Sequence, residues 1–93
     1  MRIRWTPEAA ENLAQIDHYL QLNRSALAQQ TVQEIYDGIY SLQEMPYRGR
    51  PGRVAETREL VFRKAPFVAV YTIEHETVVV VSIRHTSREP FTE

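Results

Sequence analysis

The hydrophobic pattern of this chain changes its period once, at the stretch PYRGRPGRVAE, residues 46–56. Before this stretch, apolar residues recur every three or four positions, as they do on one face of a helix. After it, they alternate or run together, as they do in strands. A length of 93 residues leaves room for one domain. The pattern therefore predicts a single α+β domain over residues 1–93.

The segment before residue 46 predicts one short strand followed by two helices. Residues 2–5, RIRW, alternate polar and apolar side chains, and Thr6 followed by proline is typical of a helix start. NRSA interrupts the helical pattern, Ser25 can cap a second helix, and Met45-Pro46 ends it. Both helices carry an apolar stripe, so a helical hairpin is expected. The stripes consist of Leu13, Ile16 and Leu20, and of Ala28, Val32, Ile35, Ile39 and Leu42.

Three consecutive strands are predicted after the loop, over residues 57–64, 66–74 and 76–85. Their connections are short enough to allow only antiparallel pairing. Neither connection contains Asn-Gly or Asp-Gly, so the sequence leaves the register open. The predicted order is β-α-α-β-β-β, an antiparallel twisted sheet packed on an N-terminal helical hairpin.

Composition excludes several classes of site. The chain has no cysteine, which rules out disulfides, thiolate catalysis and cysteine-ligated metals. Its three histidines are scattered, and its glycines do not form a nucleotide-binding motif, so neither a metal nor a cofactor is expected. No apolar run approaches the roughly 20 residues of a membrane helix, and no signal peptide is recognisable. We expect a cytoplasmic protein without membrane contact.

Charge is distributed unevenly along the chain. Residues 6–45 carry six acidic residues and one arginine, whereas residues 46–64 carry six basic residues and two acidic ones. This segregation predicts an acidic face and a basic face, the latter suited to an anionic partner. Within the basic segment, Arg58 and Glu59 are expected either to form intramolecular or cross-strand ion pairs at the sheet edge or to take part directly in function.

The last predicted strand leads into a polar cluster, in the stretch SIRHTSREP at residues 82–90. An imidazole such as that of His85 can move protons near neutral pH, and Arg84 and Arg88 could hold a phosphate. Strand alternation places Arg84 and His85 on opposite faces, which weakens a joint role. The alternative is that these residues are the solvated end of a strand.

The predicted order, together with GRPGR (49–53), TRELVF (57–62), PFVAVYTIE (66–74) and VSIRHTSREP (81–90), resembles the RelE/ParE superfamily of type II toxin–antitoxin toxins. The likeness covers nearly the whole chain. It implies a toxin that a cognate antitoxin neutralises, with a toxin–antitoxin hetero-oligomer as the expected assembly. RelE-like members are ribosome-dependent mRNA endonucleases, whereas ParE-like members poison DNA gyrase.

The chain departs from the RelE-like pattern at several positions. Residues 59–62 are ELVF where RelE-like enzymes alternate lysines, Val68 occupies the position of a catalytic arginine, and Phe91 stands where a tyrosine is expected. The resemblance therefore favours the ParE-like branch, which needs no chemistry by the toxin itself. Of the residue types that could serve an RNA-cleaving site, the chain retains Arg58, Arg63, Arg84, His85 and Arg88.

The resemblance implies three sets of site residues. For gyrase binding, they are Arg84, His85 and Arg88. In the endonuclease alternative, His85 is the base and Arg58 or Arg84 stabilises the phosphorane, with no evident general acid. The antitoxin is expected to bind the margin of the second helix and the basic loop, at Tyr36, Tyr40, Arg48, Arg50, Arg53 and Arg63. A third possibility is an inactive relative that only binds its antitoxin.

Overall fold

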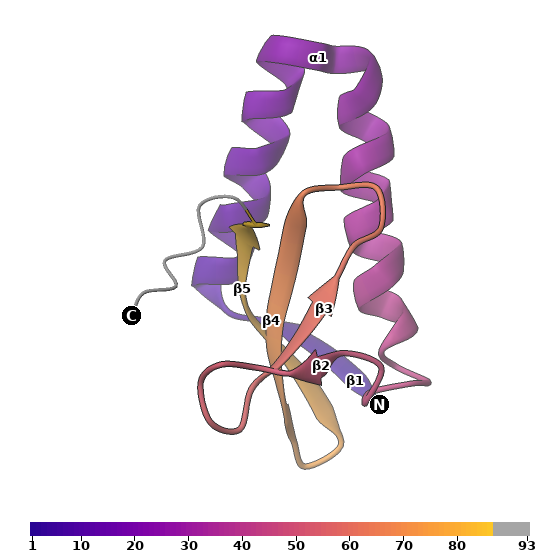
Figure 1. The fold of residues 1–93 in the computed structure, drawn as a ribbon, viewed down its shortest axis with the longest axis vertical. Helices are drawn as coiled ribbons and strands as arrows, with labels where there is room; N and C mark the ends of the chain where they lie inside the picture. The colour runs from indigo at the N-terminus through magenta and orange to yellow at the C-terminus, as the bar shows by residue number, and fades with distance from the viewer. Residues whose placement is uncertain (87–93) are drawn as a thin grey trace.

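A helical layer covers one face of a five-stranded sheet (Figure 1). The computed structural model describes residues 1–86, except for the side chains of residues 24–27. In chain order the elements are β1 (Arg2–Trp5), α1 (Pro7–Ser41), β2 (Arg50–Pro51), β3 (Arg58–Val61), β4 (Phe67–Glu74) and β5 (Thr77–His85). The predicted α+β class and order of elements are confirmed. Within the described residues, no helix combines the length and the apolar composition needed to cross a membrane.

The predicted helical hairpin is present, although its two arms belong to one continuous helix. A straight helix of 35 residues would be about 52 Å long. The longest dimension of the molecule is 38 Å, and α1 folds back near its middle into two arms that lie side by side (Figure 1). The chain therefore stays helical through the predicted break at residues 23–26. The predicted cap, Ser25, has a side chain outside the described part of the structure.

The start of α1 is fixed to the sheet by Thr6. Its hydroxyl accepts a hydrogen bond from the Ala9 N–H at 3.0 Å, as predicted for an N-cap, and donates to the Val81 carbonyl at 2.8 Å. One turn later, the Asn12 side chain accepts from the Ile83 N–H at 2.9 Å. Since β1 pairs with β5 only from Thr77 to Val80, these contacts satisfy backbone groups of β5 beyond the end of β1.

The sheet has the strand order β1-β5-β4-β3-β2. Pairing is antiparallel, as predicted, except that β1 runs parallel to β5. The central position of β5 explains its run of valines, because Val78, Val79 and Val80 are buried although they alternate between the two faces. A register shift interrupts the pairing of β4 with β5 between Val70 and Tyr71.

Two details of the strands differ from the prediction. The strand predicted over residues 57–64 ends at Val61, because the chain turns through residues 62–66 into β4. In addition, β2 was not predicted, since two residues inside a proline- and glycine-rich loop carry no periodic signal.

The hydrophobic core lies between the two helical arms and the sheet. It contains Ala9, Leu13, Ile35, Ile39, Leu42, Leu60, Phe62, Ala65, Phe67, Ala69, Tyr71, Val78, Val80 and Ile83. The apolar stripes predicted for both arms therefore contribute to one core. Tyr71 is the largest side chain that is fully buried.

The hydroxyl of Tyr71 fixes the loop that follows α1. It donates to the Pro46 carbonyl at 2.7 Å and accepts from the buried Gly49 N–H at 2.9 Å. The loop approaches so closely that a Cβ at position 49 would lie 2.7 Å from this hydroxyl oxygen and 2.8 Å from the Glu59 carbonyl oxygen. Glycine is therefore required at position 49 by close approach of the backbone.

We expect Tyr71→Phe to lower the free energy of unfolding by about 1–3 kcal/mol, because the buried Gly49 N–H loses its acceptor. In a domain of this size, each kcal/mol corresponds to a fall of roughly 4–8 °C in the thermal midpoint. Tyr47→Phe is the matched control: its ring is exposed, and we expect a change within about 0.5 kcal/mol. Equal thermal midpoints for the two variants would show that the hydroxyl does not hold the loop.

Candidate functional site

The face of the sheet turned away from α1, called here the helix-free face, is defined by strand alternation. Leu60, Ala69 and Ile83 belong to the core, so their strand neighbours point to the other side. Two rows of paired residues cross this face. One row consists of Glu59, Val70 and Ser82, and the other of Val61, Val68 and Arg84. Apart from Glu59 and Arg84, these rows carry valines and one hydroxyl.

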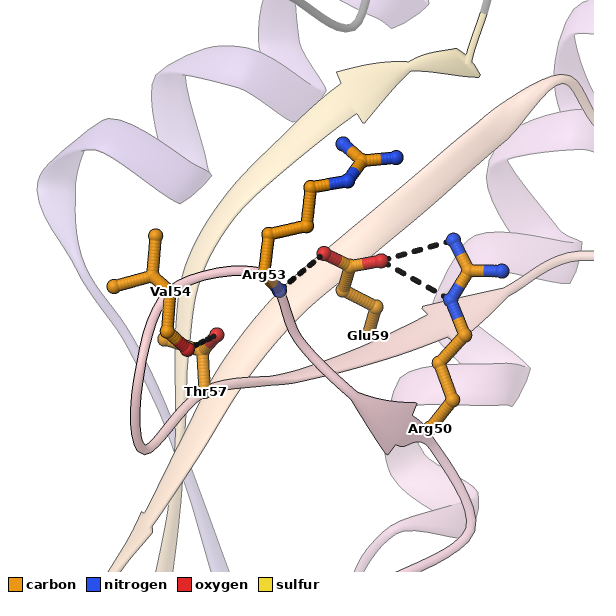
Figure 2. A network of polar contacts seen from close by, with 5 residues as sticks. All are labelled: Arg50, Arg53, Val54, Thr57 and Glu59. Atoms are coloured by element: carbon orange, nitrogen blue, oxygen red, sulfur yellow. Dashed lines mark hydrogen bonds and ion pairs between the residues drawn. The ribbon is translucent and has the colours of Figure 1, made fainter. Parts of the chain in front are cut away.

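Glu59 holds the basic loop against the helix-free face (Figure 2). Its side chain is 9% exposed, and Oε1 accepts from Arg50 Nε at 3.1 Å and Nη2 at 2.9 Å. Oε2 accepts from the Arg53 N–H at 3.3 Å. A buried carboxylate is stable only when charges and donors surround it in this way. Of the two alternatives stated for Glu59, the structure shows a cross-strand ion pair, with Arg50 of β2 as its partner.

Arg58 lies on the opposite side of β3, because it pairs with the core residue Tyr71. Its Nε donates to the Gly49 carbonyl at 3.0 Å, Nη2 donates to the Tyr47 carbonyl at 3.3 Å, and its guanidinium lies 5.3 Å from the centre of the Tyr47 ring. Arg58 forms no ion pair with Glu59, since neighbouring residues of a strand point to opposite faces. Its donors bind the backbone of the loop.

The end of β5 separates Arg84 from His85, as predicted. His85 is half-buried on the helix-facing side, where its ring meets Phe67 edge-on with centroids 5.2 Å apart. Arg84 is exposed on the helix-free face, and its Nε donates to Ser82 Oγ at 3.3 Å. Arg88 lies outside the described residues.

The structure does not bring together the three residues that the endonuclease alternative requires, namely Arg58, Arg84 and His85. His85 pairs with Phe67 and Arg58 pairs with Tyr71, four positions further along β4, which corresponds to about 13 Å along the strand. Arg84 lies on the other face of the sheet. Among the described residues, no three histidine or acidic side chains form a group that could hold a metal ion.

Three aromatic rings form a ladder at the margin of the helical hairpin. The centroids of Trp5 and Tyr36 are 5.7 Å apart, and those of Tyr36 and Tyr40 are 6.2 Å apart. Tyr36 and Tyr40 are 38% and 48% exposed. The rings line a groove of about 400 Å³ that Leu13 and Val32 also line. The spacing of the two tyrosines indicated a shared helix face, but only the fold brings Trp5 beside them.

A larger open groove of about 1390 Å³ runs between α1 and the end of β3. Tyr36, Arg48 and Arg63 line this groove. Arg50 and Arg53 lie instead at the helix-free face. The residues predicted to bind an antitoxin are therefore divided between two sides of the molecule.

Comparisons with known proteins agree with this architecture. The family model described as the ParE toxin of type II toxin–antitoxin systems, parDE, matches residues 3–90. Y4kP of Sinorhizobium fredii, which its name describes as a candidate toxin, is 34% identical over 88 residues, covering 95% of this chain and 91% of that protein. A chain of the chromosomal ParDE system of P. aeruginosa is similar with a TM-score of 0.84 and 26% identity, covering 91% of this chain and 95% of that chain.

Two more distant structures share the fold. Chains of the RelBE2 complex of Mycobacterium tuberculosis and the RelBE complex of E. coli both give TM-scores of 0.64, at 21% and 12% identity. The first covers 90% of this chain and 95% of that chain, and the second covers 90% and 94%. The sequence and fold together lead to one conclusion: the chain belongs to the ParE toxin family of type II toxin–antitoxin systems.

Proposed function

We propose that this toxin inhibits DNA gyrase and that a cognate antitoxin neutralises it by direct binding. One observation carries the first half of the proposal: the two rows across the helix-free face hold valines where RNA cleavage would need polar and charged groups. Val61, Val68 and Val70 occupy this face, and the carboxylate of Glu59 is already engaged by the basic loop. A toxin that acts by binding a protein needs no such groups.

Geometry supports gyrase inhibition over the endonuclease alternative. Cleavage of RNA would require a base and a phosphate-stabilising cation to reach the same ribose and phosphate. His85 and Arg84 point to opposite faces, and Arg58 is engaged with loop carbonyls beside Tyr71, four positions along β4 from the partner of His85. Recognition of single-stranded RNA also relies on aromatic stacking, whereas Trp5, Phe67 and Tyr71 face the helices.

Target binding is assigned to Arg84 and His85 at the end of β5, together with Arg88, which lies outside the described residues. Arg84 is exposed next to the last residue of β5, and the half-buried His85 ring packs against Phe67 in a T-shaped contact. A guanidinium and an imidazole at a rigid strand end suit a protein interface, since arginine is enriched among residues that dominate binding energy.

Antitoxin binding is assigned to the aromatic ladder and the larger groove. Exposed tyrosines beside an apolar groove are typical anchors for a partner segment. The larger groove adds charges of both signs, because Asp17, Glu34 and Asp37 line it together with Arg48, Arg63 and Lys64. The ParDE and RelBE structures that share this fold come from toxin–antitoxin systems, which supports an antitoxin as the occupant.

The proposed target is tested by inducing the toxin in cells and following DNA and mRNA in one culture. We expect gyrase-dependent DNA breaks, filamentous cells and intact transcripts. Supercoiling by purified gyrase should also fall when the toxin is added. Rapid ribosome-dependent cleavage of transcripts without an effect on purified gyrase would instead establish the endonuclease alternative.

Substitutions at the end of β5 separate binding from catalysis. We expect Arg84→Ala to reduce growth arrest strongly, with a thermal midpoint close to that of the parent because the side chain is exposed. His85→Gln should retain much of the toxicity, since glutamine keeps hydrogen-bonding capacity, whereas loss of a catalytic base would abolish it. His18→Gln, at an exposed position of α1, is the matched control. Full toxicity of Arg84→Ala would exclude this strand end as the target-binding site.

The antitoxin site is tested with Tyr40→Ala, compared with Tyr19→Ala. Both tyrosines are exposed on α1, but only Tyr40 belongs to the aromatic ladder. We expect Tyr40→Ala to weaken the toxin–antitoxin complex by roughly tenfold or more, the effect of losing an anchor worth about 1.4 kcal/mol. Tyr19→Ala should leave the dissociation constant unchanged by calorimetry. Equal affinities of the two variants would place the antitoxin elsewhere.

A further inference from the structure

Two arginines of β1 point to the helix-free face. Arg2 and Arg4 alternate with Ile3 and Trp5, which pack against the core beneath α1. Both arginines are exposed, and no hydrogen bond or ion pair joins either guanidinium to another residue of the described chain. Their positive charges are therefore presented to solvent on the face opposite the helices.

Three further arginines lie on the same face. Arg50 and the N–H of Arg53 bind Glu59, the side chain of Arg53 extends in front of the sheet (Figure 2), and Arg84 lies beside Val68. We call this set the arginine band: Arg2, Arg4, Arg50, Arg53 and Arg84. It reaches from β1 at one edge of the sheet to β2 at the other, four strand spacings or about 19 Å.

On the described strands, the helix-free face carries more basic than acidic side chains. On the described strands of the helix-free face, the carboxylates are Glu59, already bound to Arg50, and Glu74. The acidic residues of α1 are on the other side of the sheet, at Glu8, Glu11, Asp17, Glu34 and Asp37. The two layers thus carry opposite charge, so a polyanion would approach the sheet and avoid the helices.

We infer that the arginine band binds the phosphate backbone of duplex DNA directly. Guanidinium groups match the oxygens of phosphate with two parallel hydrogen bonds. The aromatic side chains of the described strands face the helices, so this face offers no stacking platform for single strands. Backbone contacts alone suffice for sequence-independent binding of a duplex. Gyrase inhibition requires only a protein contact, so this inference goes beyond the proposed function and does not rest on it.

A simpler explanation exists for Arg2 and Arg4 alone. They lie on an edge strand, and charged side chains on such a strand prevent edge-to-edge pairing with other molecules. This explanation does not extend to Arg53, which belongs to the loop after β2 and contacts Glu59 of β3 through its backbone N–H (Figure 2). The two explanations predict different consequences of removing the charges at positions 2 and 4.

The test measures binding of the purified toxin to a short labelled duplex of arbitrary sequence by fluorescence anisotropy, without gyrase, between about 50 and 200 mM salt. We expect weak, salt-dependent binding by the parent. Arg2→Gln and Arg4→Gln should each weaken it and reduce the slope of log K against log salt by about 1, and the double variant by about 2. Lys64→Gln is the control, because it removes one positive charge from the wall of the larger groove and not from the arginine band. The slope of log K against log salt should be the same for this variant as for the parent.

Two results would overturn the inference directly. One is that the parent shows no salt-dependent binding to the duplex, and the other is that the double variant has the same slope as the parent. Self-association of the variants with intact DNA binding would assign Arg2 and Arg4 to edge protection. Tighter binding to polyglutamate than to the duplex would assign the arginine band to an acidic protein. Because neither side chain contacts the core, thermal midpoints should match the parent and exclude misfolding as the cause.

Discussion

The loop between α1 and β3 depends on three polar side chains of the sheet, and the functional surfaces depend on that loop. Tyr71 binds Pro46 and Gly49 from within the core, Arg58 binds the same loop on the helix-facing side, and Glu59 binds Arg50 and Arg53 on the other side. The loop has only the two-residue ladder of β2 with β3, so these side-chain hydrogen bonds help to decide where its arginines lie.

This attachment turns a charge asymmetry of the sequence into two different surfaces. Arg48 lines the larger groove beside α1, whereas Arg50 and Arg53 extend over the helix-free face. Arginines of the same loop therefore lie on different surfaces. Arg48 lies near the exposed tyrosines of α1, whereas Arg50 and Arg53 lie on the face that also carries the arginines of β1 and β5. The acidic residues of α1 make the helical side of the molecule more negative than the helix-free face.

The chemistry of the helix-free face is set separately from the packing of the core. The helix-free face is set by residues that alternate with the core, so substitutions there change the chemistry and leave the packing intact. In this chain valines occupy positions 61, 68 and 70, and Glu59 is bound to the loop. Membership of the ParE family and the proposed action on gyrase agree with a surface built for binding.

The sequence by itself determined the elements and much of their order, because hydrophobic period reports local geometry. Leu13 and Ile16 of the first stripe, the valines of β5 and the cap at Thr6 were all predicted correctly, whereas Leu20 lies outside the core cluster. Alternation likewise predicted that Arg84 and His85 would diverge. Only the tertiary structure decided that β1 inserts beside β5, that Arg50 pairs with Glu59 and that Trp5 joins Tyr36 and Tyr40. Each of these contacts joins segments far apart in the chain or inside an aperiodic loop, and local pattern contains no information about such pairs.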